Sequence, residues 1–349
     1  MRARPKAEHI AAQGEASPSP KKPWFRAFHG YGARTVVLMA RRPAFFCEAS
    51  ETREFLSPTG TFETGDKVEM ALWYDEVNKD SLRFGAKTTR TLFVGQSPYQ
   101  KVSVFETEAL GKALMIDDLW MCAEGDEKTY HEMITHTAIT TAKKSERVLI
   151  IGGGDGGTAR EVLSYKHVKH VDLVEIDGMV IEACKKYLPE IGTAWDDPRL
   201  NVVVGDGIAW VKREDLEPYD IILVDGSDPV GPAVGLFNEG FYKACYDRLS
   251  KDGILVTQAE SPKLFYETHI ELVKTLQRIF PVVHPFYQTI LIYAGALWGW
   301  VYATKGTEYT EIQDDLMALA EARCEIYNRE IHLGAFAVPN FIKRALAAK

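Results

Sequence analysis

The stretch VLIIGGGDGGT at residues 148–158 decides the fold. Its four apolar residues predict a strand that is buried on both faces of a sheet. The glycines that follow permit a tight turn and a close approach of a ligand to the backbone. Dinucleotide enzymes use a glycine turn between a strand and a helix to bind a pyrophosphate. A turn of this kind alone is only weak evidence for a nucleotide site.

Asp155 lies inside this turn, and its negative charge would repel a phosphate. The turn therefore favours an adenosine-containing ligand that carries a cationic group and no phosphate. This argues against an NAD-dependent dehydrogenase. A structural alternative is that Asp155 only caps the helix that follows.

Four more apolar runs follow at residues 170–177, 200–206, 219–225 and 253–260, separated by helical patterns. This alternation predicts an α/β fold, a methyltransferase-like Rossmann domain with a mainly parallel sheet and helices on both faces. Residues 282–293 and 297–305 predict a closing antiparallel pair, and residues 311–328 and 340–348 predict C-terminal helices. Short alternating runs between 89 and 123 predict a small N-terminal antiparallel β domain, followed by a helix that begins at Asp126.

Acidic residues follow nearly every predicted strand, where ligands bind in parallel sheets. Glu175, 23 positions after Gly152, is suited to the hydroxyls of a ribose. Asp206, with Gly207 beside it, suits an adenine amino group or, equally, a helix N-cap. Asp225 and Asp228 form a negative site that can bind an ammonium and accept its proton. Metal binding is the rival interpretation, but no histidine lies near that loop.

Composition limits the classes of function and the domain boundaries. The chain has 349 residues and a net charge of -8, and this negative charge argues against a nucleic-acid partner. The sequence contains no run of 18 apolar residues, so we expect no membrane-spanning helix. Five scattered cysteines indicate reduced thiols in a cytoplasmic protein and no zinc site. We expect a basic, disordered extension at 1–69, the small β domain at 70–125 and the catalytic domain at 126–349. Translation starting at Met70 is a further hypothesis.

Several motifs taken together resemble the polyamine aminopropyltransferases, above all the spermidine synthases. They are Tyr99-Gln100, DEKTYHEM at 126–133, GGGDGGTAREVL at 152–163, VEIDGMVIEAC at 174–184, DGSDPVGPA at 225–233 and IHLGAFAVPNFIK at 331–343. The resemblance implies transfer of an aminopropyl group from decarboxylated S-adenosylmethionine, a co-substrate, to a diamine or polyamine, most simply putrescine to give spermidine. Methylthioadenosine is released, and no metal or permanently bound cofactor is needed. A homodimer or homotetramer is implied as well.

The resemblance also implies roles for individual residues. The nucleoside donor would be held by Gln100, Asp155, Glu175, Asp206 and Gly207, and the amine would be bound by Tyr130, His131, Asp228 and Tyr293. His131 is equally well interpreted as a structural histidine. Asp225 would be the catalytic base that removes a proton from the amine. Asp155 would attract the donor's ammonium and repel the carboxylate of ordinary S-adenosylmethionine.

The chain departs from the family pattern around the expected acceptor site. Asp118 stands where the family usually has glycine, Met121 where it often has glutamine, and the prolines around Tyr293 are missing. Asp118 pairs with an extra cationic group or is an exposed turn residue. The acceptor therefore stays open among putrescine, cadaverine, agmatine and a longer polyamine. A methyltransferase on the same fold and an inactive polyamine- or nucleoside-binding relative are the alternative functions.

Overall fold

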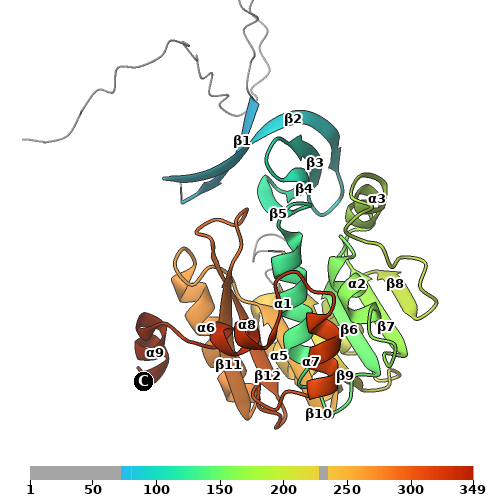
Figure 1. Ribbon diagram of the computed structural model, residues 1–349, viewed down its shortest axis with the longest axis vertical. Coiled ribbons are helices and arrows are strands. Elements are labelled where there is room, and N and C mark those ends of the chain that lie inside the picture. Colours follow the sequence, from blue (N-terminus) through green and yellow to red (C-terminus); the bar gives the residue numbers. More distant parts are fainter. Residues whose placement is uncertain (1–71, 80, 228–234, 349) are drawn as a thin grey trace, which may run out of the picture. The chain divides into compact units, whose positions relative to one another are not determined.

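The computed structural model describes residues 72–79, 81–227 and 235–348. The predictions for the N-terminal extension and for Asp228 lie outside these ranges. The described residues form two sheets with helices around the larger one (Figure 1). No helix in these ranges is both long enough and apolar enough to cross a membrane.

The smaller sheet has five antiparallel strands in the order β1-β2-β3-β4-β5. Their bounds are β1 Leu72–Asn78, β2 Leu82–Gln96, β3 Lys101–Thr107, β4 Gly111–Ile116 and β5 Leu119–Ala123. The predicted antiparallel sheet is confirmed. Strand β1 was not predicted, because its exposed Leu72 and Trp73 and its two adjacent acids give no clean alternation.

The larger sheet has seven strands in the order β11-β12-β10-β9-β6-β7-β8. Their bounds are β6 Arg147–Gly152, β7 His170–Glu175, β8 Leu200–Val204, β9 Tyr219–Asp225, β10 Leu249–Gln258, β11 Val282–Thr289 and β12 Leu297–Thr304. Strands β6 to β10 are parallel to one another, and β12 pairs antiparallel with both β10 and β11. The mainly parallel sheet and its closing antiparallel pair are therefore confirmed.

Helices cover both faces of the larger sheet. Their bounds are α1 Glu127–Ile139, α2 Gly157–Leu163, α3 Gly178–Tyr187, α4 Gly207–Val211, α5 Glu239–Arg248, α6 Tyr266–Ile279, α7 Asp314–Glu321, α8 Arg329–Ala335 and α9 Asn340–Ala347. Neighbouring strand residues point to opposite cores: Ile150 packs with α1, α2 and α7, whereas Ile151 packs with α5 and α6. Both faces of the strands are thus buried, as their continuous apolar runs indicate.

The prediction that residues 311–328 are helical is wrong beyond Glu321, where α7 ends. The buried Glu132 of α1 accepts hydrogen bonds from the backbone N–H groups of Glu325, Ile326 and Tyr327 at 2.8–2.9 Å. A carboxylate that binds three successive backbone donors stabilises a loop in place of a helix.

The position of the site follows from the topology. The chain runs outward from β6 to β7 and β8, then returns to β9 on the other side of β6. Such a reversal leaves a crevice beyond the carboxyl ends of β6 and β9. The small sheet packs on α3 next to this crevice through a cluster that includes Val104, Leu114 and Val180.

Candidate active site

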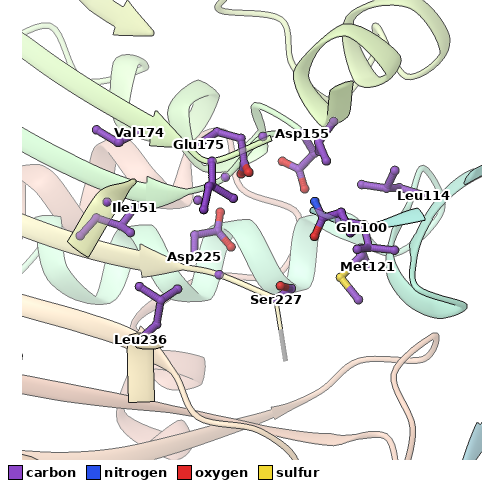
Figure 2. Close-up of a pocket in the computed structure, with 18 of the residues that line it drawn as sticks. Gln100, Leu114, Met121, Ile151, Asp155, Val174, Glu175, Asp225, Ser227 and Leu236 are labelled. Atoms are coloured by element: carbon purple, nitrogen blue, oxygen red, sulfur yellow. The ribbon is translucent and has the colours of Figure 1, made fainter. Parts of the chain in front are cut away.

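A cavity lies at the carboxyl ends of β6, β7 and β9. Figure 2 shows Asp155, Glu175 and Asp225 pointing into it from the large sheet, opposite Gln100 and Met121 of the small sheet. Eight of the predicted site residues line this cavity: Gln100, Tyr130, Asp155, Glu175, Asp206, Gly207, Asp225 and Tyr293. The remaining lining is largely apolar and includes Leu114, Ile116, Met121, Ile151, Val174, Ile176, Val180, Ile208 and Leu236.

The glycine turn brings the ends of β6 and β9 together. Gly152 has a φ of +84°, and a Cβ built on it would lie 2.1 Å from the carbonyl oxygen of Asp225. The N–H of Gly153 donates to that same carbonyl at 2.9 Å. Only glycine tolerates both this conformation and this approach. The turn thereby fixes the backbone that carries Asp225.

Asp155 faces a histidine as well as the cavity. Its Oδ1 accepts from the Gly157 N–H at 2.8 Å and lies 3.3 Å from His131 Nε2. Burial opposes ionisation of Asp155, but the charge and hydrogen bond of His131 outweigh it and lower its pKa to about 2. The N-cap position of α2 is Gly156, yet Asp155 binds the N–H of Gly157, the first residue of that helix. Asp155 therefore both supports the start of α2 and lines the cavity.

His131 lies behind Asp155 and is 1% exposed, and the cavity lining in the described ranges does not include it. Its Nδ1 is 2.6 Å from Glu127 Oε2, so two carboxylates flank the ring. Burial lowers the pKa of His131, yet these two carboxylates raise it well above its usual range. Arg160 in turn binds both oxygens of Glu127 at 2.9–3.0 Å. The histidine thus supplies a positive charge that balances Asp155 from the protein side.

Glu175 ends β7 and accepts a hydrogen bond from the Asp177 N–H at 2.9 Å. Burial raises its pKa to about 7. Asp177 caps α3 and also accepts from the Ser97 hydroxyl at 2.7 Å, which ties the Gln100 turn of the small sheet to this strand end. Sequence reasoning missed Ser97 and Asp177, since nothing local marks two residues 80 positions apart as partners.

Asp206 fits both interpretations offered from the sequence. Its Oδ1 accepts from the Ile208 N–H at 2.8 Å, so it caps α4, and the residue also lines the cavity. Gly207 is buried, and a Cβ there would lie 2.5 Å from the Ile151 side chain. The Asp206 carboxylate can accept from an exocyclic amino group, and the apolar neighbours suit a flat heteroaromatic ring.

Asp225 ends β9 in the middle of the site. Its Oδ2 accepts from the Thr158 hydroxyl at 2.7 Å, and Tyr130 of α1 lines the same cavity. Burial, and next the charge of Asp155, raise the pKa of Asp225. A carboxylate with a raised pKa is a better proton acceptor than an ordinary surface aspartate.

A second cavity adjoins the first. The two share the lining residues Met121, Tyr130, Gly226, Ser227 and Tyr293. The Tyr293 hydroxyl donates to the Met121 carbonyl at 2.6 Å, which holds the shared boundary together. The second cavity is lined on its other sides by Glu76, Trp120, Gln258, Phe265, Ala294 and Trp298.

Glu76 of β1 was missed by sequence reasoning along with its strand. It is 5% exposed, and its oxygens accept from the Trp120 N–H at 2.9 Å and the Asn78 amide at 2.6 Å. Burial raises its pKa. Its hydrogen-bond donors are thus neutral groups, which leaves a carboxylate in a cavity ready for a ligand cation.

Asp118 pairs with a cation of the protein itself. Its Oδ1 lies 2.7 Å from Lys101 Nζ and accepts from the Tyr74 hydroxyl at 2.5 Å. Its φ of +67° fits the turn between β4 and β5. The structure therefore favours the turn interpretation over a role as a site for an extra cationic group.

Comparisons with known proteins agree with this geometry. Residues 127–314 match the spermine/spermidine synthase domain, and residues 72–124 match the spermidine synthase tetramerisation domain. The polyamine aminopropyltransferase of Prochlorococcus marinus strain NATL2A is 44% identical over 280 residues, 79% of this chain and 96% of that protein. That of Thermoanaerobacter sp. strain X514 is 42% identical over 274 residues, 78% of this chain and 98% of the relative.

Two solved structures are similar over most of their length. A spermidine synthase in complex with the transition state analogue AdoDATO superposes with a TM-score of 0.76 and 34% identity, covering 79% of this chain and 94% of its own. The spermidine synthase from Thermotoga maritima gives a TM-score of 0.74 and 33% identity, and the match covers 80% of this chain and 95% of that structure's chain.

Proposed function

Because the chain belongs to the spermine/spermidine synthase family and is a polyamine aminopropyltransferase, we propose that it converts putrescine to spermidine with decarboxylated S-adenosylmethionine as donor. The observation that carries the proposal is the pair of adjoining cavities. Asp225 lines the larger cavity, next to Gly226 and Ser227, which line both cavities. One cavity has the size and polarity for a nucleoside. The other ends on a buried carboxylate suited to an amine.

The larger cavity is the proposed donor site. Glu175 is suited to hydrogen-bond the ribose hydroxyls, and Asp206 and Gly207 to bind the adenine edge against Ile151 and Leu236. Gln100 closes the site from the small sheet.

Asp155 is the proposed ligand of the donor's ammonium. Ordinary S-adenosylmethionine carries a carboxylate on the carbon that bears this ammonium. That carboxylate would approach the anionic Asp155 and be repelled. The protonated His131 lies on the far side of Asp155, so it holds Asp155 ionised without contributing to the cavity lining in the described ranges.

The smaller cavity is the proposed acceptor site. A diamine would place one ammonium at Glu76 and extend its other nitrogen past Tyr130 and Tyr293 to Asp225. The aromatic walls, Trp120 and Trp298 among them, suit the methylene chain between the two nitrogens. The neutral hydrogen-bond donors around Glu76 support recognition of a second positive charge.

The proposed reaction is an in-line displacement. Asp225 accepts one proton from the near ammonium, because a protonated amine has no free electron pair. The freed nitrogen attacks the propyl carbon bonded to the sulfonium, a C–N bond forms as the C–S bond breaks, and the bonding pair moves to sulfur. The neutral thioether of methylthioadenosine leaves, and spermidine carries a new secondary ammonium. Because this leaving group is good, much of the catalysis is positioning.

The proposal extends to assembly and location. A homotetramer is supported by the match of residues 72–124 to a tetramerisation domain. A cytoplasmic location is supported by free cysteines at positions 122, 184, 245 and 324 of the described chain and by small-molecule substrates.

A mass-spectrometric panel tests the proposed function. The enzyme is incubated with decarboxylated or ordinary S-adenosylmethionine and with putrescine, cadaverine, agmatine or spermidine in turn. We expect equimolar spermidine and methylthioadenosine from the decarboxylated donor with putrescine, and the slowest turnover with spermidine. Methylated amine without methylthioadenosine, or faster turnover with another acceptor, would contradict the proposal.

A further inference from the structure

Thr158 reaches across the glycine turn to the proposed catalytic base. It is the second residue of α2, it is fully buried, and its Oγ1 donates to Asp225 Oδ2 at 2.7 Å. The two residues are 67 positions apart. The motif GGGDGGT therefore contributes a side chain to the base, in addition to the glycines that let the backbone turn.

The hydroxyl of Thr158 is free for this bond because of its place in the helix. Thr137 and Thr141 of α1 illustrate the usual case, since their hydroxyls donate to the carbonyls of Met133 and Thr137 four residues earlier. The residue four positions before Thr158 is Gly154, which lies in the turn outside α2. With no helical carbonyl behind it, the Thr158 hydroxyl points to the end of β9.

The carboxylate of Asp225 is restrained from several sides. Gly153 holds its backbone carbonyl, and a Cβ on Gly153 would lie 3.1 Å from Oδ2. The titratable groups that face Asp225 come from every neighbouring element: Tyr130 and His131 of α1, Asp155 of the turn, Glu175 of β7 and Tyr293 of the loop before β12. Burial and the charge of Asp155 raise the pKa of Asp225, whereas His131, the Thr158 hydroxyl and the nearby Tyr130 lower it.

We propose that Thr158 is a positioning residue for the aminopropyl transfer, whose hydroxyl holds Oδ2 of Asp225 and leaves Oδ1 for the acceptor amine. The proposal rests on the proposed function, in which Asp225 takes the proton of that amine. The hydrogen bond from Thr158 to Oδ2 limits the rotation of the Asp225 carboxylate and so restrains the direction of Oδ1. The same bond stabilises the charged form that a base requires.

The test compares three variants with the wild type by the pH dependence of kcat with saturating decarboxylated S-adenosylmethionine and putrescine. Thr158→Val is nearly isosteric and lacks the hydroxyl, while Thr158→Ser keeps it. We expect Thr158→Val to lower kcat at neutral pH by about tenfold and to move the acidic limb of the profile upward by about one unit, with the donor KM within about twofold. Thr158→Ser should retain most of the wild-type kcat and keep the acidic limb close to its wild-type position. Thr137→Val is the matched control, equally buried on α1, and should leave the limb in place.

A pH profile of Thr158→Val equal to that of the wild type would overturn the proposal, as would equal loss in Thr158→Ser. If Thr158→Val does not fold, Thr158→Ala against Thr158→Ser isolates the hydroxyl at smaller volume, and equal profiles for that pair overturn the proposal. Failure of the proposed function is distinguishable, because the wild type would then release no methylthioadenosine from this substrate pair. That result would overturn the role of Thr158 as well.

Discussion

The two halves of the site are built in different ways. The acids of the proposed donor half follow four neighbouring parallel strands, β6, β7, β8 and β9, so they come from one edge of one sheet. The proposed acceptor half gathers residues from β1 and β5 of the small sheet and from α1, β10 and β12 of the other layer. The fold of one sheet therefore places the acids of the donor half, while the acceptor half depends on how the two sheets pack.

The two halves also differ in how they stabilise a buried negative charge. Asp155 has His131 as a cation within the protein, and its pKa is low. Glu76 has the Trp120 N–H and the Asn78 amide as donors, and burial raises its pKa. The charge of Asp155 is thus balanced within the protein, whereas Glu76 gains most from a cation that the ligand brings.

The largest effect should come from Asp225, next to the boundary of the two halves. Asp225→Asn keeps the shape and removes the proton acceptor, so we expect kcat to fall by about a thousandfold. Binding of methylthioadenosine, measured by calorimetry, should stay within about twofold, because neither half is dismantled. Loss of nucleoside binding in step with kcat would contradict the role of Asp225 as the base, because Asp225 would then act mainly in binding the donor.

A smaller effect is expected on the affinity of the proposed donor half for its nucleoside, which should depend on pH. The pKa of Glu175 is raised to about 7, so it is largely protonated at pH 6 and largely ionised at pH 8. The ionised form accepts two ribose hydroxyls, and the affinity for methylthioadenosine should therefore rise by about tenfold over this interval. Calorimetry with this uncharged ligand isolates the protein group.

Glu175→Gln is the control for that titration. It should bind methylthioadenosine more weakly and with no dependence on pH between 6 and 8. A pH-independent affinity in the wild type would show that Glu175 does not recognise the ribose in its ionised form.

Sequence reasoning brought together the acids that line the first cavity, because a parallel sheet places its strand ends at one edge. Asp155, Glu175 and Asp225 each follow an apolar run, and this local pattern was enough to collect them. It left open whether Asp206 caps a helix or faces the cavity, and the structure places it in both positions.

The acceptor half was not predictable in the same way. Glu76 lies on an edge strand with weak alternation, and its approach to Tyr130 depends on the packing of two sheets. The Thr158–Asp225 bond was hidden for a related reason, since hydrogen-bond partners 67 residues apart leave no local signal. From the sequence, His131 was equally well interpreted as an amine-binding residue or as a structural histidine. The structure places it behind the cavity, between the carboxylates of Glu127 and Asp155.

The most direct test of the division into two halves is a comparison of two acceptors in two enzymes. Putrescine and n-butylamine differ in the far nitrogen that Glu76 is proposed to bind, and kcat/KM is measured for each in the wild type and in Glu76→Gln. We expect the wild type to prefer putrescine by about tenfold or more, and Glu76→Gln to lose that preference while its KM for decarboxylated S-adenosylmethionine is unchanged. An undiminished preference for putrescine in Glu76→Gln would contradict the assignment of the second cavity to the acceptor.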